Sequence, residues 1–97
     1  MPASKRLEWS AAAEREYLEA LAYIAADSGE TNALLIAGRV ERVESLVAAN
    51  PLIGTPGRRA GTREHPMART GYTLVYRVSA TKVTIVRFLH QRMDFRK

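Results

Sequence analysis

Arginine is the residue type whose number and placement point most directly to chemistry in this sequence. The first 50 residues carry 5 Lys/Arg against 8 Asp/Glu, a charge of −3, whereas residues 51–97 carry 10 against 2, a charge of +8. Guanidinium groups make paired, charge-assisted hydrogen bonds with phosphates and carboxylates. The basic half therefore suits nucleic acid or an acidic protein segment, although part of its charge can serve solubility alone. We expect two or three of its arginines to contact a target, drawn from Arg58, Arg59, Arg63, Arg69, Arg77, Arg87 and Arg92.

Histidine is the other residue type that could take part in chemistry, because its charge changes near neutral pH. A metal site is not expected, since neither His65 nor His90 has companion ligands at a suitable spacing and the chain has no cysteine. Neither a glycine-rich phosphate loop nor a nucleophile elbow occurs, so no cofactor is expected.

The elements that must position these side chains begin with a short strand at Leu7–Trp9. Ser10 is a good helix N-cap and predicts a helix over about 11–27, and Asn50-Pro51 ends a second helix over about 31–49. The connection between the helices is short, so they should lie antiparallel. Apolar residues at steps of three and four define their buried stripes: Tyr17, Leu18, Leu21, Ile24 and Ala25 in the first, and Ala33, Ile36, Val40, Val43 and Val47 in the second.

From residue 72 onward apolar and polar residues alternate, which predicts a β-hairpin. With Ala80-Thr81 as the loop, Arg77 pairs with Thr84, Val75 with Val86 and Thr73 with Phe88. Arg63–Met67 is expected to add a third strand. The hairpin face opposite the helices would then carry Arg77, His90 and an apolar patch of Val75, Val86 and Phe88, and an exposed apolar face usually has a partner. Strict alternation places Arg87 on the helix-packed face, unless its side chain reaches the sheet edge or a bulge shifts the register.

The predicted fold class is therefore α+β, as one domain over residues 1–97. It comprises a short N-terminal strand, an antiparallel two-helix hairpin and a three-stranded antiparallel sheet packed on the helices. No run of about 18 apolar residues occurs, and the first residues lack the apolar stretch of a secretory signal. The cytoplasm is the expected location, with no membrane partner.

The order and residues of these segments resemble the RelE/ParE toxin superfamily over about 85 positions. The matching pieces are Trp9-Ser10 before a helix with Glu14 and Tyr17, then Tyr23-Ile24, Asn50-Pro51-Leu52-Ile53-Gly54, Gly61-Thr62-Arg63-Glu64, Gly71-Tyr72-Thr73-Leu74-Val75-Tyr76-Arg77 and Val86-Arg87-Phe88-Leu89-His90-Gln91-Arg92-Met93-Asp94. The resemblance implies a growth-inhibiting toxin of a type II toxin–antitoxin system. It also implies neutralisation by a cognate antitoxin, with a toxin dimer or a heterotetramer as a possible assembly.

The superfamily contains two kinds of toxin, and the sequence favours one of them. RelE-like members cleave mRNA on the ribosome, whereas ParE-like members inhibit DNA gyrase without being nucleases. The positions that carry basic catalytic residues in a RelE-like nuclease resemble Glu64, Pro66 and Thr73 here, and a carboxylate repels phosphate. The segment from Leu89 to Asp94 is more similar to ParE proteins. The resemblance therefore favours a non-enzymatic gyrase inhibitor.

Two alternatives remain open. One is an mRNA endonuclease that uses Arg77, His90 and Arg92, since some nucleases of the superfamily use a late histidine; the other is a non-toxic partner-binding module. The interpretation as a gyrase inhibitor predicts an antitoxin surface at Val75, Val86 and Phe88. It predicts a target-binding surface at Arg63, Arg69, Arg77, Arg87, His90, Arg92 and Asp94.

Overall fold

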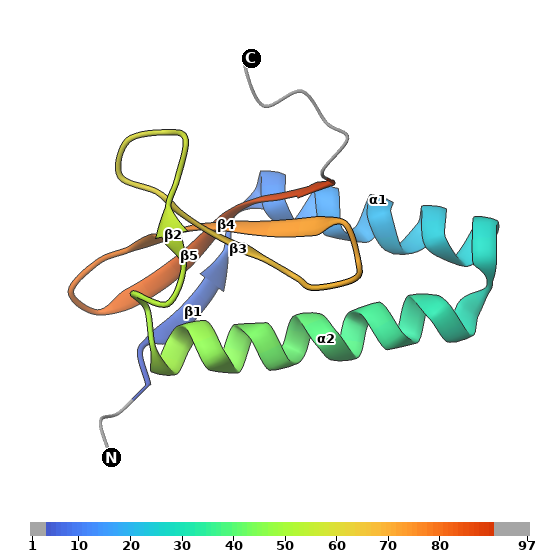
Figure 1. Ribbon diagram of the computed structural model, residues 1–97, viewed down its shortest axis with the longest axis horizontal. Coiled ribbons are helices and arrows are strands. Elements are labelled where there is room, and N and C mark those ends of the chain that lie inside the picture. Colours follow the sequence, from blue (N-terminus) through green and yellow to red (C-terminus); the bar gives the residue numbers. More distant parts are fainter. Residues whose placement is uncertain (1–3, 91–97) are drawn as a thin grey trace.

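The computed structural model describes residues 4–90, which form two helices and a five-stranded sheet (Figure 1). The helices are α1 (Ala11–Ser28) and α2 (Glu30–Ala49). The strands are β1 (Arg6–Trp9), β2 (Thr55–Pro56), β3 (Arg63–Pro66), β4 (Tyr72–Val78) and β5 (Lys82–His90), in the spatial order β1-β5-β4-β3-β2. The predicted α+β class and the three antiparallel strands β3, β4 and β5 are confirmed.

Two strand pairings extend the predicted sheet. The N-terminal strand β1 joins the same sheet by pairing in parallel with β5. The chain between these two strands contains both helices and the strands β2, β3 and β4. The two-residue strand β2 adds an outer edge next to β3. Thr55-Pro56 lies among glycines and prolines, and that composition predicted only a loop. Pro56 is compatible with an edge position because one side of an edge strand forms no hydrogen bonds with another strand, so its missing N–H is tolerated.

The helical hairpin begins and turns as its residue types predict. The Ser10 hydroxyl accepts a hydrogen bond from the Ala13 N–H at 3.0 Å, which confirms Ser10 as the N-cap of α1. Gly29 alone separates the helices and has φ 99° and ψ 160°, a conformation that only glycine adopts readily. Figure 1 shows the two helices running antiparallel, as expected. Leu18, however, was predicted to be buried and is 58% exposed, while the small Ala13 is fully buried and lets α1 approach β5 closely.

A β-bulge in β5 corrects the predicted register. Arg77 pairs with Thr84 as expected, but Val75 pairs with Arg87 and Leu74 with Phe88, so Val86 is an extra residue in the ladder. Because side chains alternate along a strand, a shift of one residue moves every later side chain to the other face. Phe88 is therefore in the core, 1% exposed, and its predicted place in an open patch is wrong.

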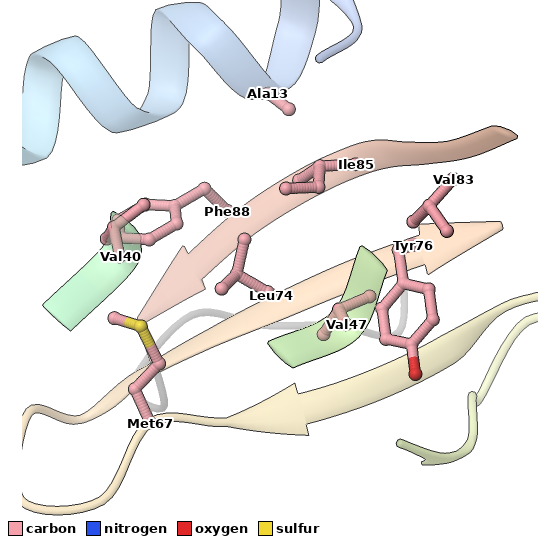
Figure 2. Close-up of a cluster of buried hydrophobic side chains, with 9 residues drawn as sticks. All are labelled: Ala13, Val40, Val47, Met67, Leu74, Tyr76, Val83, Ile85 and Phe88. Atoms are coloured by element: carbon pink, nitrogen blue, oxygen red, sulfur yellow. The ribbon is translucent and has the colours of Figure 1, made fainter. Parts of the chain in front are cut away.

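The core lies between the helices and one face of the sheet (Figure 2). It consists of Ala13, Val40, Val47, Met67, Leu74, Tyr76, Val83, Ile85 and Phe88. Tyr76 is the largest fully buried side chain, and its hydroxyl is satisfied by the loop before β2. It donates to the Pro51 carbonyl and accepts from the Gly54 N–H, both at 2.8 Å. A Cβ at position 54 would lie 2.5 Å from that hydroxyl, so the loop requires glycine at this position.

Candidate functional site

A row of aromatic rings runs from β1 to the last residue of β5. Trp9 stacks on Tyr17 with 5.1 Å between ring centroids, and Tyr17 meets Phe88 edge-on at 5.1 Å. Phe88 stacks on Tyr72 at 4.9 Å, and Tyr72 in turn contacts the His90 imidazole edge-on at 4.9 Å. Aromatic rings prefer offset-stacked and edge-on arrangements of this kind. The row fixes Tyr72 and His90 at the end of the sheet, beside α1.

Three adjoining hollows surround Tyr72 and His90, and both residues line all three. One hollow, of about 350 Å³, lies against α1; a second, of about 520 Å³, against the β3–β4 loop; and a third, of about 360 Å³, against both helices. We call this combined depression the His90 groove. Besides Tyr72 and His90, its lining includes Glu19, Tyr23, Leu35, Arg39 and Arg69.

The β3–β4 loop brings its backbone close to the imidazole. Gly71 has φ 79°, and a Cβ there would lie 2.8 Å from His90 Nε2. Arg69 also has a left-handed backbone, with φ 67°, which is uncommon for a residue other than glycine. These conformations bend the loop around the imidazole, so that Arg69 and His90 line the same part of the groove.

Glu16 of α1 holds the end of β5 in place. Its carboxylate accepts two hydrogen bonds from Arg87 Nε, at 3.1 and 3.0 Å, and one from Arg87 Nη2 at 2.6 Å. It also accepts the Phe88 backbone N–H at 3.0 Å, on the stretch of β5 beyond its pairing with β1. The hydrogen bonds to Glu16 raise the pKa of Arg87 above its usual value. Arg87 is therefore part of a contact that secures the strand carrying His90, and the bulge resolves its awkward predicted position.

The structure separates the other residues predicted to bind a target. Arg63 Nη1 donates to the Gly54 carbonyl at 2.7 Å and supports the loop before β2. Arg77 is exposed on β4, and its Nη1 lies 3.5 Å from the Ala60 carbonyl oxygen. Arg69 is exposed and makes no hydrogen bond or ion pair with any residue of the described range 4–90. Arg92 and Asp94 lie outside the described residues.

Arg77 and His90 do not form the shared surface that we predicted. Arg77 pairs with Thr84 and His90 with Tyr72, so five residues of β4 separate their levels, roughly 17 Å along the strand. The bulge also turns His90 toward the helix side with Phe88, while Arg77 stays on the opposite face. Their predicted common face is therefore wrong.

The three positions that resemble a nuclease site lie together on the face opposite the helices. Pro66 pairs with Thr73 and Glu64 with Val75, which places the three on one face. The Glu64 carboxylate accepts the Arg58 backbone N–H at 3.0 Å and lies 3.7 Å from the Arg58 guanidinium. These positions thus carry a carboxylate that lies beside Arg58, a pyrrolidine ring and a hydroxyl, and none of the three side chains is basic.

The predicted apolar patch on this opposite face is smaller than expected. Val75 is only 6% exposed, Val86 is partly buried, and Phe88 belongs to the core. Within residues 4–90, no helix is both long and apolar enough to cross a membrane. The same part of the chain contains no cluster of three or more potential metal-binding side chains.

Comparison with known proteins now identifies the family. The family described as "ParE toxin of type II toxin-antitoxin system, parDE" matches residues 7–95. The chain belongs to the ParE toxin family. A relative from Sinorhizobium fredii, named "Putative toxin Y4kP", is 34% identical over 89 residues, which cover 91% of this ParE-family chain and 92% of that protein.

Solved structures share the ParE-family fold. A chain of the chromosomal ParDE toxin–antitoxin system from P. aeruginosa aligns with a TM-score of 0.80 and 19% identity, covering 90% of this chain and 96% of that one. A chain of the RelBE2 toxin–antitoxin complex from Mycobacterium tuberculosis aligns with a TM-score of 0.66 and 25% identity, covering 93% and 94%. Both likenesses agree with the observed helical hairpin and sheet, and the predicted toxin family is confirmed.

Sequence reasoning missed several residues of the His90 groove in this ParE-family toxin. Tyr23, Leu35 and Arg39 had no assigned role, and Glu16 was only one of several acidic residues near the start of a helix. Tyr23 did carry a signal, since it lies outside the predicted apolar stripe of its helix and is a large aromatic residue. The bulge, which brings His90 to the groove, had its signal in Arg87, whose charge conflicted with strict alternation.

Proposed function

We propose that this ParE-family toxin arrests growth by binding DNA gyrase without cleaving nucleic acid, and that a cognate antitoxin neutralises it. The observation that carries the proposal is the face containing Glu64, Pro66 and Thr73. Cleavage of RNA through its own 2′-hydroxyl requires a proton acceptor, a proton donor and cations that stabilise the charged phosphorane. Glu64 is the only ionisable side chain of the three, and Arg58 lies 3.7 Å from its carboxylate. Glu64 could accept a proton, but none of the three side chains is a cation that could stabilise the phosphorane.

The neutralising partner is supported by the structural relatives, which are components of the ParDE and RelBE2 toxin–antitoxin systems. The charge of +8 on residues 51–97 favours an acidic partner segment. Arg69, Arg77 and His90 remain proposed contacts with the target, since all three retain some solvent exposure. Arg63 and Arg87 are weaker candidates because they already bind the chain itself.

The test compares two assays on the same purified toxin. It should block supercoiling by gyrase and leave ribosome-bound mRNA intact, and adding the product of the adjacent open reading frame should restore supercoiling. Unimpaired supercoiling at toxin concentrations well above that of gyrase would refute the proposal. Normal growth on expression of the chain alone would instead support a non-toxic binding module.

A second candidate is an mRNA endonuclease centred on His90. It is favoured by one observation: His90 and the exposed Arg69 line the same groove, which places a titratable imidazole and a cation side by side. This candidate predicts cuts in translated messages that disappear in His90→Ala and weaken in Arg69→Ala. Arg77→Ala, on the other face, should leave such cuts unchanged.

A further inference from the structure

A patch of cationic side chains lies at the end of the sheet that carries the β4–β5 turn. Arg6 of β1 pairs with Lys82 of β5. Arg77 of β4 pairs with Thr84, two residues further along β5. Because Val83 lies between these two β5 residues and points into the core, alternation places the three cations on the face opposite the helices. They lie within two strand spacings of one another, about 10 Å across the sheet.

The β2–β3 loop extends this cationic surface. Arg77 Nη1 lies 3.5 Å from the Ala60 carbonyl oxygen, and a Cβ at Gly61 would lie 2.8 Å from the same nitrogen, so the loop packs against this guanidinium. Figure 1 shows the loop and the β4–β5 turn at the same end of the sheet, away from the connection between the helices. Arg58 and Arg59 are exposed in the loop. We call the whole set the turn-end patch: Arg6, Arg58, Arg59, Arg77 and Lys82.

Two carboxylates lie within the turn-end patch, and cations of the patch bind both. Glu8 lies 3.1 Å from Lys82 Nζ and 3.3 Å from Arg6 Nη2. Glu64 lies 3.7 Å from Arg58 Nε, and its side chain is only 14% exposed. Five cations and two carboxylates leave the patch a net charge of +3. An arginine has five N–H donors, so a guanidinium that contacts a carboxylate can still bind a phosphate.

The surroundings of the patch favour phosphate groups over an apolar partner group. Among residues 4–90, the sheet face that carries the patch has no aromatic side chain. The aromatic residues of the strands all lie on the helix side: Trp9, Tyr72, Tyr76 and Phe88. A protein partner usually needs aromatic or aliphatic anchors, and a single-stranded nucleic acid needs rings on which its bases stack. A DNA duplex needs neither, since its phosphates line the outside of the double helix.

We propose that the turn-end patch binds the phosphate backbone of duplex DNA. Arg77 in the centre and Arg6 and Lys82 beside it contact phosphate oxygens, and the loop arginines extend the contact along the duplex. Arg77 lies four residues along β4 from Thr73, roughly 13 Å, so this binding does not require the positions that resemble a nuclease site. The inference goes beyond the proposed function, because it concerns the toxin and DNA alone and can fail without affecting inhibition of gyrase.

The experiment measures binding of the purified toxin to two fluorescein-labelled duplexes of unrelated sequence, by fluorescence anisotropy between about 50 and about 200 mM salt. Both duplexes should bind with the same Kd, on the order of 10⁻⁴–10⁻⁶ M at physiological salt. A plot of log Kd against log salt should have a slope of about 3, as expected for three phosphate contacts. Arg77→Glu and Arg6→Glu should each raise the Kd at least about fivefold and lower the slope by about one.

Matched controls separate the patch from a general attraction between charges. Arg15→Glu and Arg42→Glu make the same change in net charge at exposed positions on the helices. Both should change the Kd less than about twofold, because salt screens charges on the far side of the molecule. The four substituted side chains are all exposed, so circular dichroism and thermal melting should show that every variant folds.

Four results would overturn the inference. Two concern DNA: absence of binding at about 50 mM salt, and tighter binding of a single strand than of the duplex with the same sequence. The third is equal weakening of binding by the patch variants and the control variants. The fourth is tighter patch-dependent binding of a polyglutamate peptide than of the duplex. The supercoiling assay tests the gyrase proposal separately, so failure of DNA binding and failure of gyrase inhibition are distinguishable.

Discussion

Glu16 is the side chain whose removal should most clearly reveal how the end of β5 is held. In Glu16→Ala the Phe88 N–H loses its acceptor at 3.0 Å, and the Arg87 guanidinium loses all three of its hydrogen bonds. An unsatisfied amide in a buried residue costs about 1–3 kcal/mol, and a half-exposed ion pair adds about 0.5–1 kcal/mol. We expect the free energy of unfolding to fall by about 2–3 kcal/mol, which lowers the Tm of a domain this size by roughly 10–20 °C.

Urea denaturation and thermal melting measure this loss of unfolding free energy. Two further variants separate the contribution of the Phe88 amide from that of the ion pair. Glu16→Gln keeps a neutral acceptor for the Phe88 amide and Arg87→Ala removes only the cation, so each should cost about 1 kcal/mol. Glu19→Ala, one turn along α1 and exposed, serves as the control and should stay within about 0.5 kcal/mol of wild type. A loss below about 0.5 kcal/mol in Glu16→Ala would show that the carboxylate does not secure the strand.

Three other variants, two single and one double, test other contacts and the effect of burial on tyrosine. Tyr76→Phe removes the hydroxyl that donates to Pro51 and accepts from Gly54, and urea denaturation should show a loss of about 1–3 kcal/mol. Gly71→Ala combines φ 79° with a Cβ 2.8 Å from His90 Nε2, so it should lower the Tm and move the His90 imidazole signals in NMR spectra; unchanged signals would contradict the close approach. Burial raises the pKa of Tyr17 and of Tyr72 above the ordinary value of 10.0, so their contribution to stability is complete below pH 10 and is lost as the pH rises through the folded-state pKa. The unfolding free energy should therefore fall above pH 10 and fall less in the double variant Tyr17→Phe/Tyr72→Phe; equal losses in both proteins would count against this explanation.

The local elements of the fold could be predicted because each has a short-range cause. Ser10 starts α1, Asn50-Pro51 ends α2, and the alternation after Tyr72 defines the hairpin. The parallel pairing of β1 with β5 could not be predicted in the same way. It joins residues more than 70 positions apart, and nothing in the Leu7–Trp9 sequence specifies its neighbour in the sheet.

The site was predicted less well than the fold, for two physical reasons. An extra residue in a ladder leaves the alternation intact on both sides of it, so the sequence Val-Thr-Ile-Val-Arg-Phe-Leu-His is compatible with either register, and only the charge of Arg87 conflicted with the simpler one. Groove walls such as Tyr23 and Leu35 are apolar residues on amphipathic helices, which normally indicate a core. Tyr23 and Leu35 are exposed because the helices extend beyond the sheet on which they pack. This is a property of the assembled fold and not of the local sequence.

The strand order β1-β5-β4 also has a consequence for biosynthesis. Chains leave the ribosome N-terminus first, and β5, which lies between β1 and β4, is the last strand to be synthesised within the described residues 4–90. Until residues 82–90 emerge, β1 has no neighbour to pair with, and Ile85 and Phe88 are missing from the core. A growing polypeptide of this toxin therefore cannot complete its sheet or its core until residues 82–90 have left the ribosome.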